Sequence, residues 1–364
     1  MVKLPPFRID IDSGASLTDQ MVRGFREAIL SGYYRPGDVL PPIRTLERHF
    51  GVSLFVPREA LSRLANEGLV NPRPRIGSVV TARTGASSRL GHVMLVIPDV
   101  PGAYYANAFG DVLRAHLASA GYSFTRVSVT KNLRGAYDPK VLEPEYNRHV
   151  DLTVLLYDTP EIARYLSRKG VPFITIGQKS CKLRHCVGNV HRPRNAVADD
   201  FFRHCRMAGV KNVLLADWEG EGFSVLEGVQ HPGVKVDMVR VPSKDGGRNP
   251  GDIQRGALDF FRGLLTTHRK SLPDLVFVVD DNIACGAFLA ILDAGIKVPD
   301  ELRLAAWTHL GGGVVYPMPL TRMEMDPFDH GRRVAKAILN HLSGGVFPSD
   351  IALRPVYIVG KSFP

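Results

Sequence analysis

Apolar residues at helical spacing predict that the first part of the chain is largely helical. An amphipathic helix over residues 16–30 is predicted by a buried face made of Leu17, Met21, Phe25 and either Ala28 or Ile29. Ser16 and Asp19 resemble a capping pair at the start of this helix. The glycines and the proline of residues 31–38 then predict a turn.

Two more short helices are predicted, joined by a tight turn. The first follows Pro41-Pro42, with inward-facing Ile43, Leu46 and Phe50 and outward-facing Arg44, Thr45 and Arg48. Gly51-Val52-Ser53 predicts the turn, with Ser53 as the candidate N-cap of the next helix. That helix ends near Gly68 and buries Ala60, Leu61 and Leu64.

A small hairpin with a basic tip follows these helices. Leu69-Val70 and residues 76–80 predict its strands, and Asn71 to Arg75 form the tip. Three helices and such a hairpin make a winged helix-turn-helix. This arrangement suits double-stranded DNA, because the second helix of the pair fits the major groove and the wing lays arginines on phosphates or in the minor groove.

The charge distribution points the same way. The chain of 364 residues has a formal net charge of +10. Residues 1–90 carry thirteen Lys and Arg against eight Asp and Glu, so half of the net charge lies in a quarter of the chain. A basic N-terminal segment indicates a polyanion partner, whereas the rest has the charge density of an ordinary soluble body.

Many residues between positions 15 and 81 keep the order and spacing of a known family without a gap. They are Leu17, Gln20, Ile29, Pro36-Gly37-Asp38, Leu40-Pro41, Arg44, Leu46, Gly51-Val52-Ser53, Arg58-Glu59-Ala60-Leu61, Leu64, Glu67-Gly68-Leu69-Val70, Gly77 and Val80. The segment resembles the GntR family of bacterial transcription regulators. The resemblance implies that Arg44 and Arg58 contact DNA and that Arg73 and Arg75 meet phosphate. The other candidate DNA-binding residues are Thr45, Ser53, Leu54, Phe55 and Gly77.

The start of the recognition helix departs from the family pattern. Polar residues usually follow the turn serine, but here Leu54-Phe55-Val56 do. Pro57 lacks the N–H that a helix capped at Ser53 would use, so this helix is expected to begin nearer Val56. Leu54 and Phe55 either pack under the displaced helix start, which is the favoured interpretation, or contact thymine methyl groups.

After a small, polar linker at residues 82–90, strands and helices alternate. Buried strands are predicted at 92–100, 152–158, 173–177, 210–216, 275–281 and 302–307. Helices are predicted near 106–120, 160–169, 194–207, 251–269, 282–294 and 327–343. The fold class is therefore α/β, with parallel sheets covered by helices on both faces and enough chain for two lobes. The predicted domains are residues 1–81 and 91–364.

Landmarks of a second family run through residues 91–364. They are Val93–Ile97, Pro98-Asp99, Tyr104-Tyr105, Gly110, Gly121-Tyr122, Gly170-Val171-Pro172, Asp280-Asp281, Ala284, Gly286, Gly295, Val298-Pro299, Pro319-Leu320-Thr321, Gly331 and Ala335. This part resembles the LacI/GalR effector-binding domain, which shares its fold with type I periplasmic sugar-binding proteins. The resemblance implies two Rossmann-like lobes joined by three chain crossings, with a ligand in the cleft between them.

The second resemblance supplies candidates for the ligand site. It implies that Tyr104 or Tyr105 stacks on a sugar ring while the other lies in the core, and that Asp281 accepts two hydroxyls unless it merely caps a helix. Trp307 is either a ring platform or a core residue. The remaining candidate ligand-binding residues are Asn107, His191, Arg192 and Asn282.

Three polar anchors of this family are altered. Val225 stands where an arginine is expected, and His191, followed by Arg192, and Thr308 stand where aspartates are usual. The ligand is therefore expected to be a different sugar, another small polar molecule, or a lost effector.

Composition and missing motifs exclude several other classes. With 45% apolar and 23% charged residues the chain is neither disordered nor fibrous, and no segment predicts a membrane span or a secretory signal. Four cysteines make no disulfide framework, so a soluble cytoplasmic protein without membrane partners is expected. Cys181, His185, Cys186 and His191 cluster in sequence, but without a paired Cys-x-x-Cys motif no metal is predicted. The absence of a P-loop, a Gly-x-Ser-x-Gly elbow, a His-Glu-x-x-His motif and a Schiff-base lysine context argues against an enzyme and against a cofactor.

The sequence thus predicts a ligand-responsive transcription regulator with double-stranded DNA, a small sugar-like effector and a second copy of itself as partners. A homodimer is expected because one winged helix contacts too few bases for selective binding. Repression is the commoner behaviour in the GntR family and is the expected mode.

Overall fold

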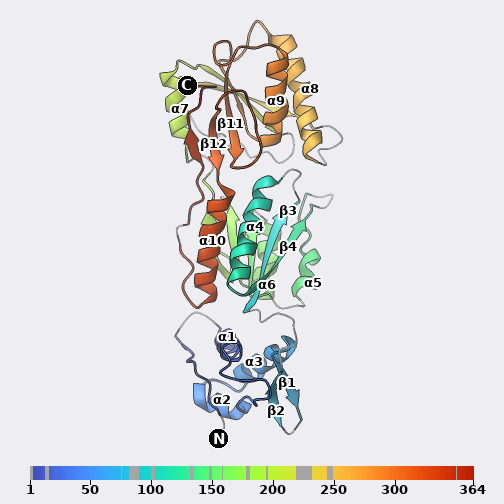
Figure 1. Cartoon of the computed structure of the whole chain (residues 1–364), viewed down its shortest axis with the longest axis vertical. Coiled ribbons are helices and arrows are strands. Elements are labelled where there is room, and N and C mark those ends of the chain that lie inside the picture. Colours follow the sequence, from blue (N-terminus) through green and yellow to red (C-terminus); the bar gives the residue numbers. More distant parts are fainter. Residues whose placement is uncertain are drawn as a thin grey trace. The chain divides into compact units, whose positions relative to one another are not determined.

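The computed structural model describes residues 3–12, 16–74, 76–81, 90–99, 103–131, 135–146, 150–157, 159–177, 181–193, 196–218, 232–243, 249–349 and 351–364. The described chain forms two compact units, Met1–His92 with Ala118–Ser123, and Val93–Leu117 with Phe124–Pro364 (Figure 1). The predicted linker at 82–90 lies outside the described residues except for its last residue. No described helix is both long enough and apolar enough to cross a bilayer.

The first unit is a winged helix-turn-helix, as predicted. Its elements are α1 (Leu17–Leu30), α2 (Ile43–Phe50), α3 (Phe55–Asn66), β1 (Val70–Arg73) and β2 (Gly77–Val80). The Ser16 hydroxyl accepts a hydrogen bond from the Asp19 amide at the start of α1, which confirms the predicted cap. Gly51 ends α2 in the left-handed region at φ 66°, where a side chain is disfavoured. The antiparallel strands β1 and β2 form the wing.

The apolar face of each helix meets in one core. Its fully buried members include Met21, Phe25, Leu46, Ala60 and Leu64, with Val80 from the wing. The segment before α1 also packs here, which the sequence pattern did not predict. The Phe7 ring lies 5.2 Å from the rings of both Phe25 and Phe50. Gln20 fixes this segment by hydrogen bonds to the backbone of Asp10.

The predicted Ser53 cap is wrong. Helix α3 begins at Phe55 with Leu54 in the N-cap position, and no side chain caps it. The Val56 amide, which a Ser53 hydroxyl would have bound, donates to the Ser53 carbonyl at 3.0 Å instead. Pro57 has no amide hydrogen to offer. The helix start is therefore displaced by the proline, in the direction that the sequence indicated.

The second unit contains two lobes, each built on a mainly parallel sheet. The first sheet has the order β4-β3-β5-β6-β7 and the second the order β13-β12-β11-β10-β8-β9. The strands of the first lobe are β3 (Gly91–Pro98), β4 (Tyr122–Val129), β5 (Leu152–Leu156), β6 (Phe173–Gly177) and β7 (Cys186–His191). Those of the second are β8 (Asn212–Trp218), β9 (Lys235–Val241), β10 (Leu275–Val278), β11 (Arg303–His309), β12 (Thr321–Met325) and the antiparallel β13 (Val356–Ile358).

Helices cover both faces of each sheet, as predicted. The first lobe holds α4 (Tyr104–Ser119), the short η1 (Pro139–Leu142) and α5 (Glu143–Tyr146), α6 (Pro160–Lys169) and α10 (Pro327–Leu342). The second holds α7 (Ala198–Met207), α8 (Pro250–His268) and α9 (Asp281–Asp293). In β10 the side chains alternate, so that Val276 and Val278 pack with the residues of α8 and α9, whereas Phe277 meets Phe201 of α7.

The chain passes between the lobes three times. Residues 192–197 connect β7 to α7, Asp326 connects β12 to α10, and residues 354–355 connect the segment beside β7 to β13. That segment is held by His191, whose amide donates to Ile351 and whose carbonyl accepts from Leu353. The two-lobe architecture with three crossings is confirmed.

Candidate functional site

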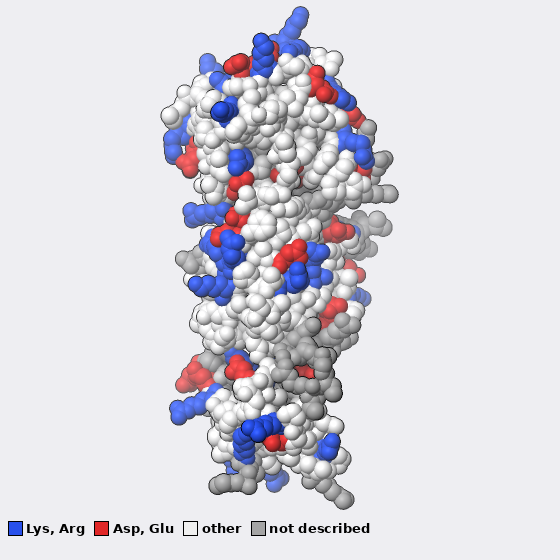
Figure 2. All heavy atoms as spheres, viewed as in Figure 1, with Lys and Arg blue, Asp and Glu red and all other residues white. Residues whose placement is uncertain are grey.

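The arginines of the first unit fall into two groups. Arg26 is buried and binds Glu67 at 2.7 Å, and Arg63 binds Asp19 and Glu59. Arg44 of α2, Arg58 of α3 and Arg73 of the wing are exposed, and none of the three pairs with a described carboxylate. Figure 2 shows basic side chains at the surface of the same unit as well as over the second unit. The unpaired group is therefore free to meet a polyanion.

The exposure of Phe55 decides between the two interpretations of the helix start. Its side chain is 67% exposed in the first turn of α3, while Val56 and Pro57 are buried. The favoured interpretation, that Phe55 packs under the helix, is therefore wrong. Leu54 beside it is half-buried. A single exposed aromatic is common at a protein surface, and here its exposure leaves the ring accessible to a partner.

The other candidates of the first unit are also near its surface. Ser53 and Gly77 are exposed and Thr45 is half-buried. Gly77 adopts φ 111°, and a Cβ atom at this position would lie 3.3 Å from Cγ1 of Val39. Arg75 lies outside the described residues.

In the second unit the carboxyl ends of the parallel strands carry most of the candidate ligand-binding residues. When the strands of each lobe are counted along the chain, the first sheet has the order 2-1-3-4-5 and the second the order 2-1-3-4-5-6, with the antiparallel β13 as its last strand. Such sheets leave a crevice where the strand order reverses, here between β3 and β5 and between β8 and β10. Tyr104 and Tyr105 follow β3, and Asp281 follows β10. The candidates from both lobes therefore lie at the places where open parallel sheets bind ligands.

Asp281 does not cap its helix. The cap of α9 is Asp280, which accepts from the amides of Asn282 and Ile283, and burial together with the neighbouring Asp281 raises the pKa of Asp280. The Asp281 carboxylate is 5% exposed and holds His309, accepting from its amide at 3.1 Å and lying 2.5 Å from its Nδ1. A Cβ atom at Gly312 would come within 2.8 Å of the same carboxylate.

Tyr104 reaches across from the first lobe to the second. Its hydroxyl donates to the carbonyl of Leu310 at 3.0 Å, just after β11. A Cβ atom at Gly311 would lie 2.2 Å from this hydroxyl, so the contact requires glycine there. Partial burial, with the Asp281 and Asp326 carboxylates nearby, raises the pKa of Tyr104.

Tyr105 is the core member of the tyrosine pair, in agreement with the favoured interpretation. It is 2% exposed, stacks on Phe109 and lies 5.4 Å from the His309 ring. Burial raises the pKa of Tyr105, and burial together with Arg192 lowers the pKa of His330 to about 4. The Tyr105 hydroxyl therefore keeps its proton and donates to the neutral His330 ring at 2.9 Å.

Arg192 lies between two aromatic rings at the end of β7. Its guanidinium carbon is 4.6 Å from the Tyr105 centroid and 4.8 Å from that of Tyr157. Tyr157, which was not singled out from the sequence, ends β5 with φ 69°, a conformation that non-glycine residues rarely adopt. Backbone strain of this kind concentrates at functional sites.

Trp307 is 5% exposed within β11, which favours the core interpretation over the ring platform. Two other buried side chains near strand ends, Thr159 after β5 and Thr308 of β11, have hydroxyls without a hydrogen-bond partner in the described structure. Neither threonine was predicted from the sequence to bind the ligand, although Thr308 was noted as standing where an aspartate is usual.

The remaining predicted ligand-binding residues are not brought into this group by any contact of the described structure. Asn107 is exposed and accepts from Arg126 at 2.9 Å. Asn282 is half-buried and accepts from Gln254 at 3.3 Å. The backbone of His191 is engaged in the chain crossing.

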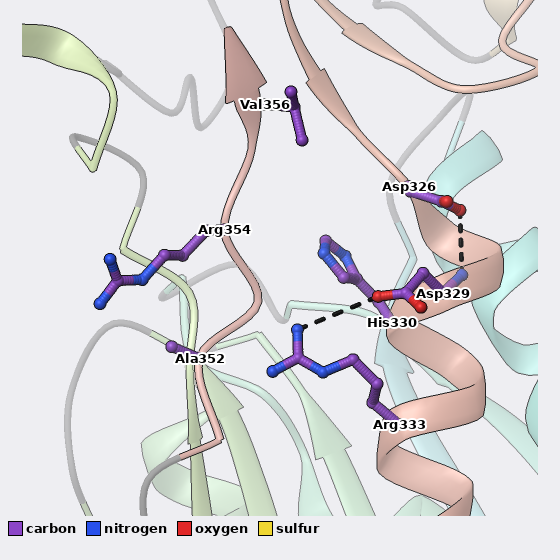
Figure 3. Close-up of a pocket in the computed structure, with 7 residues that line it drawn as sticks. All are labelled: Asp326, Asp329, His330, Arg333, Ala352, Arg354 and Val356. Carbon is purple, nitrogen blue, oxygen red and sulfur yellow. Dashed lines mark hydrogen bonds and ion pairs between the residues drawn. The ribbon is translucent and has the colours of Figure 1, made fainter. Parts of the chain in front are cut away.

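Two cavities open in the second unit. One of about 460 Å³ lies along Thr308, His309 and the loop Gly311 to Leu320. The other, of about 500 Å³, lies where two of the chain crossings pass (Figure 3). In Figure 3 Arg333 of α10 faces Asp329, whereas the side chain of Arg354 on the crossing points away from both.

Comparisons with known proteins match both units. Residues 17–80 match the gntR family of bacterial regulatory proteins, and residues 220–363 match the periplasmic binding protein-like domain. The chain joins a gntR-type helix-turn-helix domain to a periplasmic-binding-protein-like body. Both resemblances predicted from the sequence are confirmed.

Relatives of the gntR-type domain carry names of regulators. The chain is 29% identical over 91 residues to the transcriptional repressor MelR of Bacillus subtilis and 48% identical over 54 residues to the uncharacterized regulator YieP of Escherichia coli. These matches cover 25% and 15% of this chain, and 26% and 24% of the relatives, so the chain spans about a quarter of the proteins that it matches here.

For the body, the sequence matches extend over more of the chain, and many solved structures are similar to it. It is part of a match of 25% identity to the catabolite control protein A of Staphylococcus aureus, over 66% of this chain and 70% of the relative. A LacI-family regulator from Arthrobacter sp. in complex with lactose is similar over 75% of this chain and 99% of its own, at 15% identity and a TM-score of 0.57. A LacI-family regulator from Bifidobacterium animalis gives the same TM-score at 17% identity, over 74% and 97% of the two chains. These structures establish the LacI-type fold of the periplasmic-binding-protein-like body.

Proposed function

We propose that this protein is a DNA-binding transcription regulator, and that a small polar ligand in its body changes its affinity for an operator. The observation that carries the first half is the set of unpaired arginines, Arg44, Arg58 and Arg73, on a helix-turn-helix and its wing. Exposed arginines without a carboxylate partner are available to bind the phosphate oxygens of DNA. The repressors among the relatives support repression as the mode of action.

DNA selection tests this proposal. Duplexes that the full chain retains from a random library are labelled, and the binding constant is measured by fluorescence anisotropy at several salt concentrations. We expect the affinity to fall steeply with salt as condensed counterions are released from the phosphates. A chain that enriches no sequence, or whose affinity is independent of salt, is not such a regulator.

We place the ligand in the cleft between the lobes, on Tyr104 and Asp281, with Tyr105 supporting the site from the core. A ligand bound by both lobes favours their closed arrangement, and only such differential binding shifts the conformational equilibrium. Lobe closure in a dimer changes the spacing of the two tethered helix-turn-helix domains, so ligand and operator then alter each other's affinity by the same factor, typically about 5- to 150-fold. A paired titration of operator with and without ligand measures that factor.

The oligomer and the domain boundaries belong to the same proposal. We expect residues 1–81 and 91–364 to be the two domains and the body to carry the homodimer contact. Sedimentation of the body fragment from residue 86 onward should show a dimer at micromolar concentration. A monomer would place the contact in the first domain or on the operator.

A second candidate is a regulator whose body has lost its effector. The observation that favours it is that Asp281 is already bound to His309 and Tyr104 to the Leu310 carbonyl. A thermal-shift screen of sugars and sugar derivatives separates the two candidates, because a ligand at 100 times its dissociation constant adds about 2.7 kcal/mol of stability.

A further inference from the structure

Arg192 is a buried cation at the carboxyl ends of the first lobe's strands. The residue is 6% exposed and follows β7 directly. Its amide donates to the Gly177 carbonyl at the end of β6, which fixes the backbone. The rings of Tyr105 and Tyr157 flank the guanidinium, so its position is set by both the backbone and the packing.

No described carboxylate neutralises this charge. Arg192 makes no ion pair with the described residues, and its Nε atom is buried without a hydrogen-bond partner there. The nearest aromatic faces attract a cation but offer no acceptor in the plane of the guanidinium, where its N–H groups point. His330, the ionisable ring bonded to Tyr105, has a lowered pKa partly because of Arg192, so it adds no negative charge.

A buried arginine without a partner is strongly unfavourable, because the loss of hydration is not repaid. Stacking on the tyrosine rings alone provides no hydrogen-bond acceptor for the N–H groups of the guanidinium. A buried polar group without a partner calls for an explanation, and a ligand that completes its hydrogen bonds is one. The partner that suits a guanidinium best is a planar or tetrahedral oxyanion, which accepts two parallel N–H bonds.

We propose that Arg192 binds an oxyanion, so that the ligand of the cleft is a small hydroxylated anion, a carboxylate or a phosphate ester, and not a neutral sugar. This inference rests on the proposed ligand cleft and names the class of its ligand. The buried hydroxyls of Thr159 in the first lobe and Thr308 in the second also lack a hydrogen-bond partner among the described residues.

Charge-matched compounds test the proposal on the full chain. D-glucose, D-galactose and D-ribose are each compared with the corresponding sugar acid and phosphate ester by thermal unfolding and calorimetry, at constant ionic strength. Inorganic phosphate is included as the simplest oxyanion probe. The variants are Arg192→Gln, which removes the charge, Arg192→Lys, which keeps the charge without the fork, and Arg203→Gln as the control, since Arg203 is an exposed arginine of α7 paired with Asp200.

We expect an acid or a phosphate ester to stabilise the wild type while its neutral parent does not at the same concentration. Hydrogen bonds to charged groups correspond to about a 10- to 100-fold change in affinity, so Arg192→Gln should lose at least about tenfold and Arg192→Lys less. Arg203→Gln should bind as the wild type does. Thermal unfolding without ligand shows that each variant is folded.

Three results overturn the proposal. They are a neutral sugar that binds as tightly as its acid and ester, an anion preference that survives in Arg192→Gln, and a wild type that neither phosphate nor any anion of the panel stabilises at millimolar concentration. Operator binding is measured separately. A chain that binds anions through Arg192 but enriches no DNA sequence refutes the proposed regulator and leaves this inference intact, while the converse refutes the inference alone.

Discussion

The Asp281 carboxylate lies 2.5 Å from Nδ1 of His309 and also accepts the His309 amide at 3.1 Å. Asp281 begins α9 and His309 ends β11, so this pair ties two neighbouring strand ends of the second lobe together. The His309 ring in turn faces Tyr105 of the first lobe at 5.4 Å. The pair therefore lies beside a contact between the two lobes.

Removing the carboxylate should cost stability before any ligand is considered. We expect Asp281→Ala to lower the free energy of unfolding by about 1.5–3 kcal/mol, since the hydrogen bonds lost involve a charged, buried acceptor. Urea denaturation measures the change. Asp293→Ala at the end of the same helix is the control, because its partner Arg262 is exposed and such surface pairs contribute about 0–1 kcal/mol. Equal losses in the two variants would mean that Asp281 has no special structural role.

The loop after β11 offers a matched pair of glycines. Gly311 and Gly313 both have φ 84°, but a Cβ atom meets the Tyr104 hydroxyl only at Gly311. Each substitution to alanine should lower the free energy of unfolding by about 1–2 kcal/mol, because alanine disfavours the left-handed backbone conformation. We expect Gly311→Ala to cost more than Gly313→Ala, by the roughly 0.5–1.5 kcal/mol of the Tyr104–Leu310 hydrogen bond. Thermal unfolding of the two variants measures the difference, and no difference would show that this contact between the lobes contributes nothing.

His330 should make the body acid-sensitive. Its pKa is about 4 in the folded chain, below the value of 6.5 of a free histidine. The unfolded chain therefore takes up this proton first as the pH falls, and up to ~3 kcal/mol of stability is lost between pH 6.5 and pH 4. The free energy of unfolding measured across this range should fall more steeply in the wild type than in His330→Gln. The exposed His268→Gln serves as the control, and parallel curves for wild type and His330→Gln would contradict the assignment.

Arg58 is expected to contact a base edge or a phosphate of the operator. Arg58→Ala should weaken binding by about 1–3 kcal/mol if it contacts a base. It should leave the stability of the domain nearly unchanged, because the side chain is exposed and unpaired. Arg203→Ala on the body is the comparison for lost positive charge. Operator affinity is measured at moderate salt. If Arg58→Ala binds as tightly as the wild type, Arg58 is not part of the interface.

Leu54 and Phe55 are expected to contact thymine methyl groups, since packing does not account for the exposure of Phe55. Replacing individual thymines of the operator by uracil should weaken binding at one or two positions. Leu54→Ala or Phe55→Ala should abolish the difference between the two bases at those positions. If every uracil substitution is silent, these side chains read no bases.

The positions of most helices and central strands along the chain were predictable because their hydrophobic periodicity is strong. The spacing of Leu17, Met21 and Phe25 and the buried runs of β5, β6 and β10 all appear where the sequence placed them. The strands outside the predicted runs are β4, β7, β9, β12 and β13; all but β12 lie at an edge of their sheet, and β12 lies next to the edge strand β13. Edge strands are half-solvated, as Arg126 of β4 and Asp237 of β9 show, so they lack the continuous apolar run of a central strand.

The sequence by itself determined the two domain types, the α/β body and the candidate DNA-contacting arginines of the first domain, because these follow from local spacing and from motifs. Tertiary structure alone decided which polar groups meet. His309 and His330 carry no motif, yet they are the partners of Asp281 and Tyr105, 28 and 225 residues away. It also decided that Phe55 is exposed and that Arg192 lies between two tyrosines without a described carboxylate. Such pairings depend on where separate strand ends converge in space, and side-chain spacing along one segment contains no information about that.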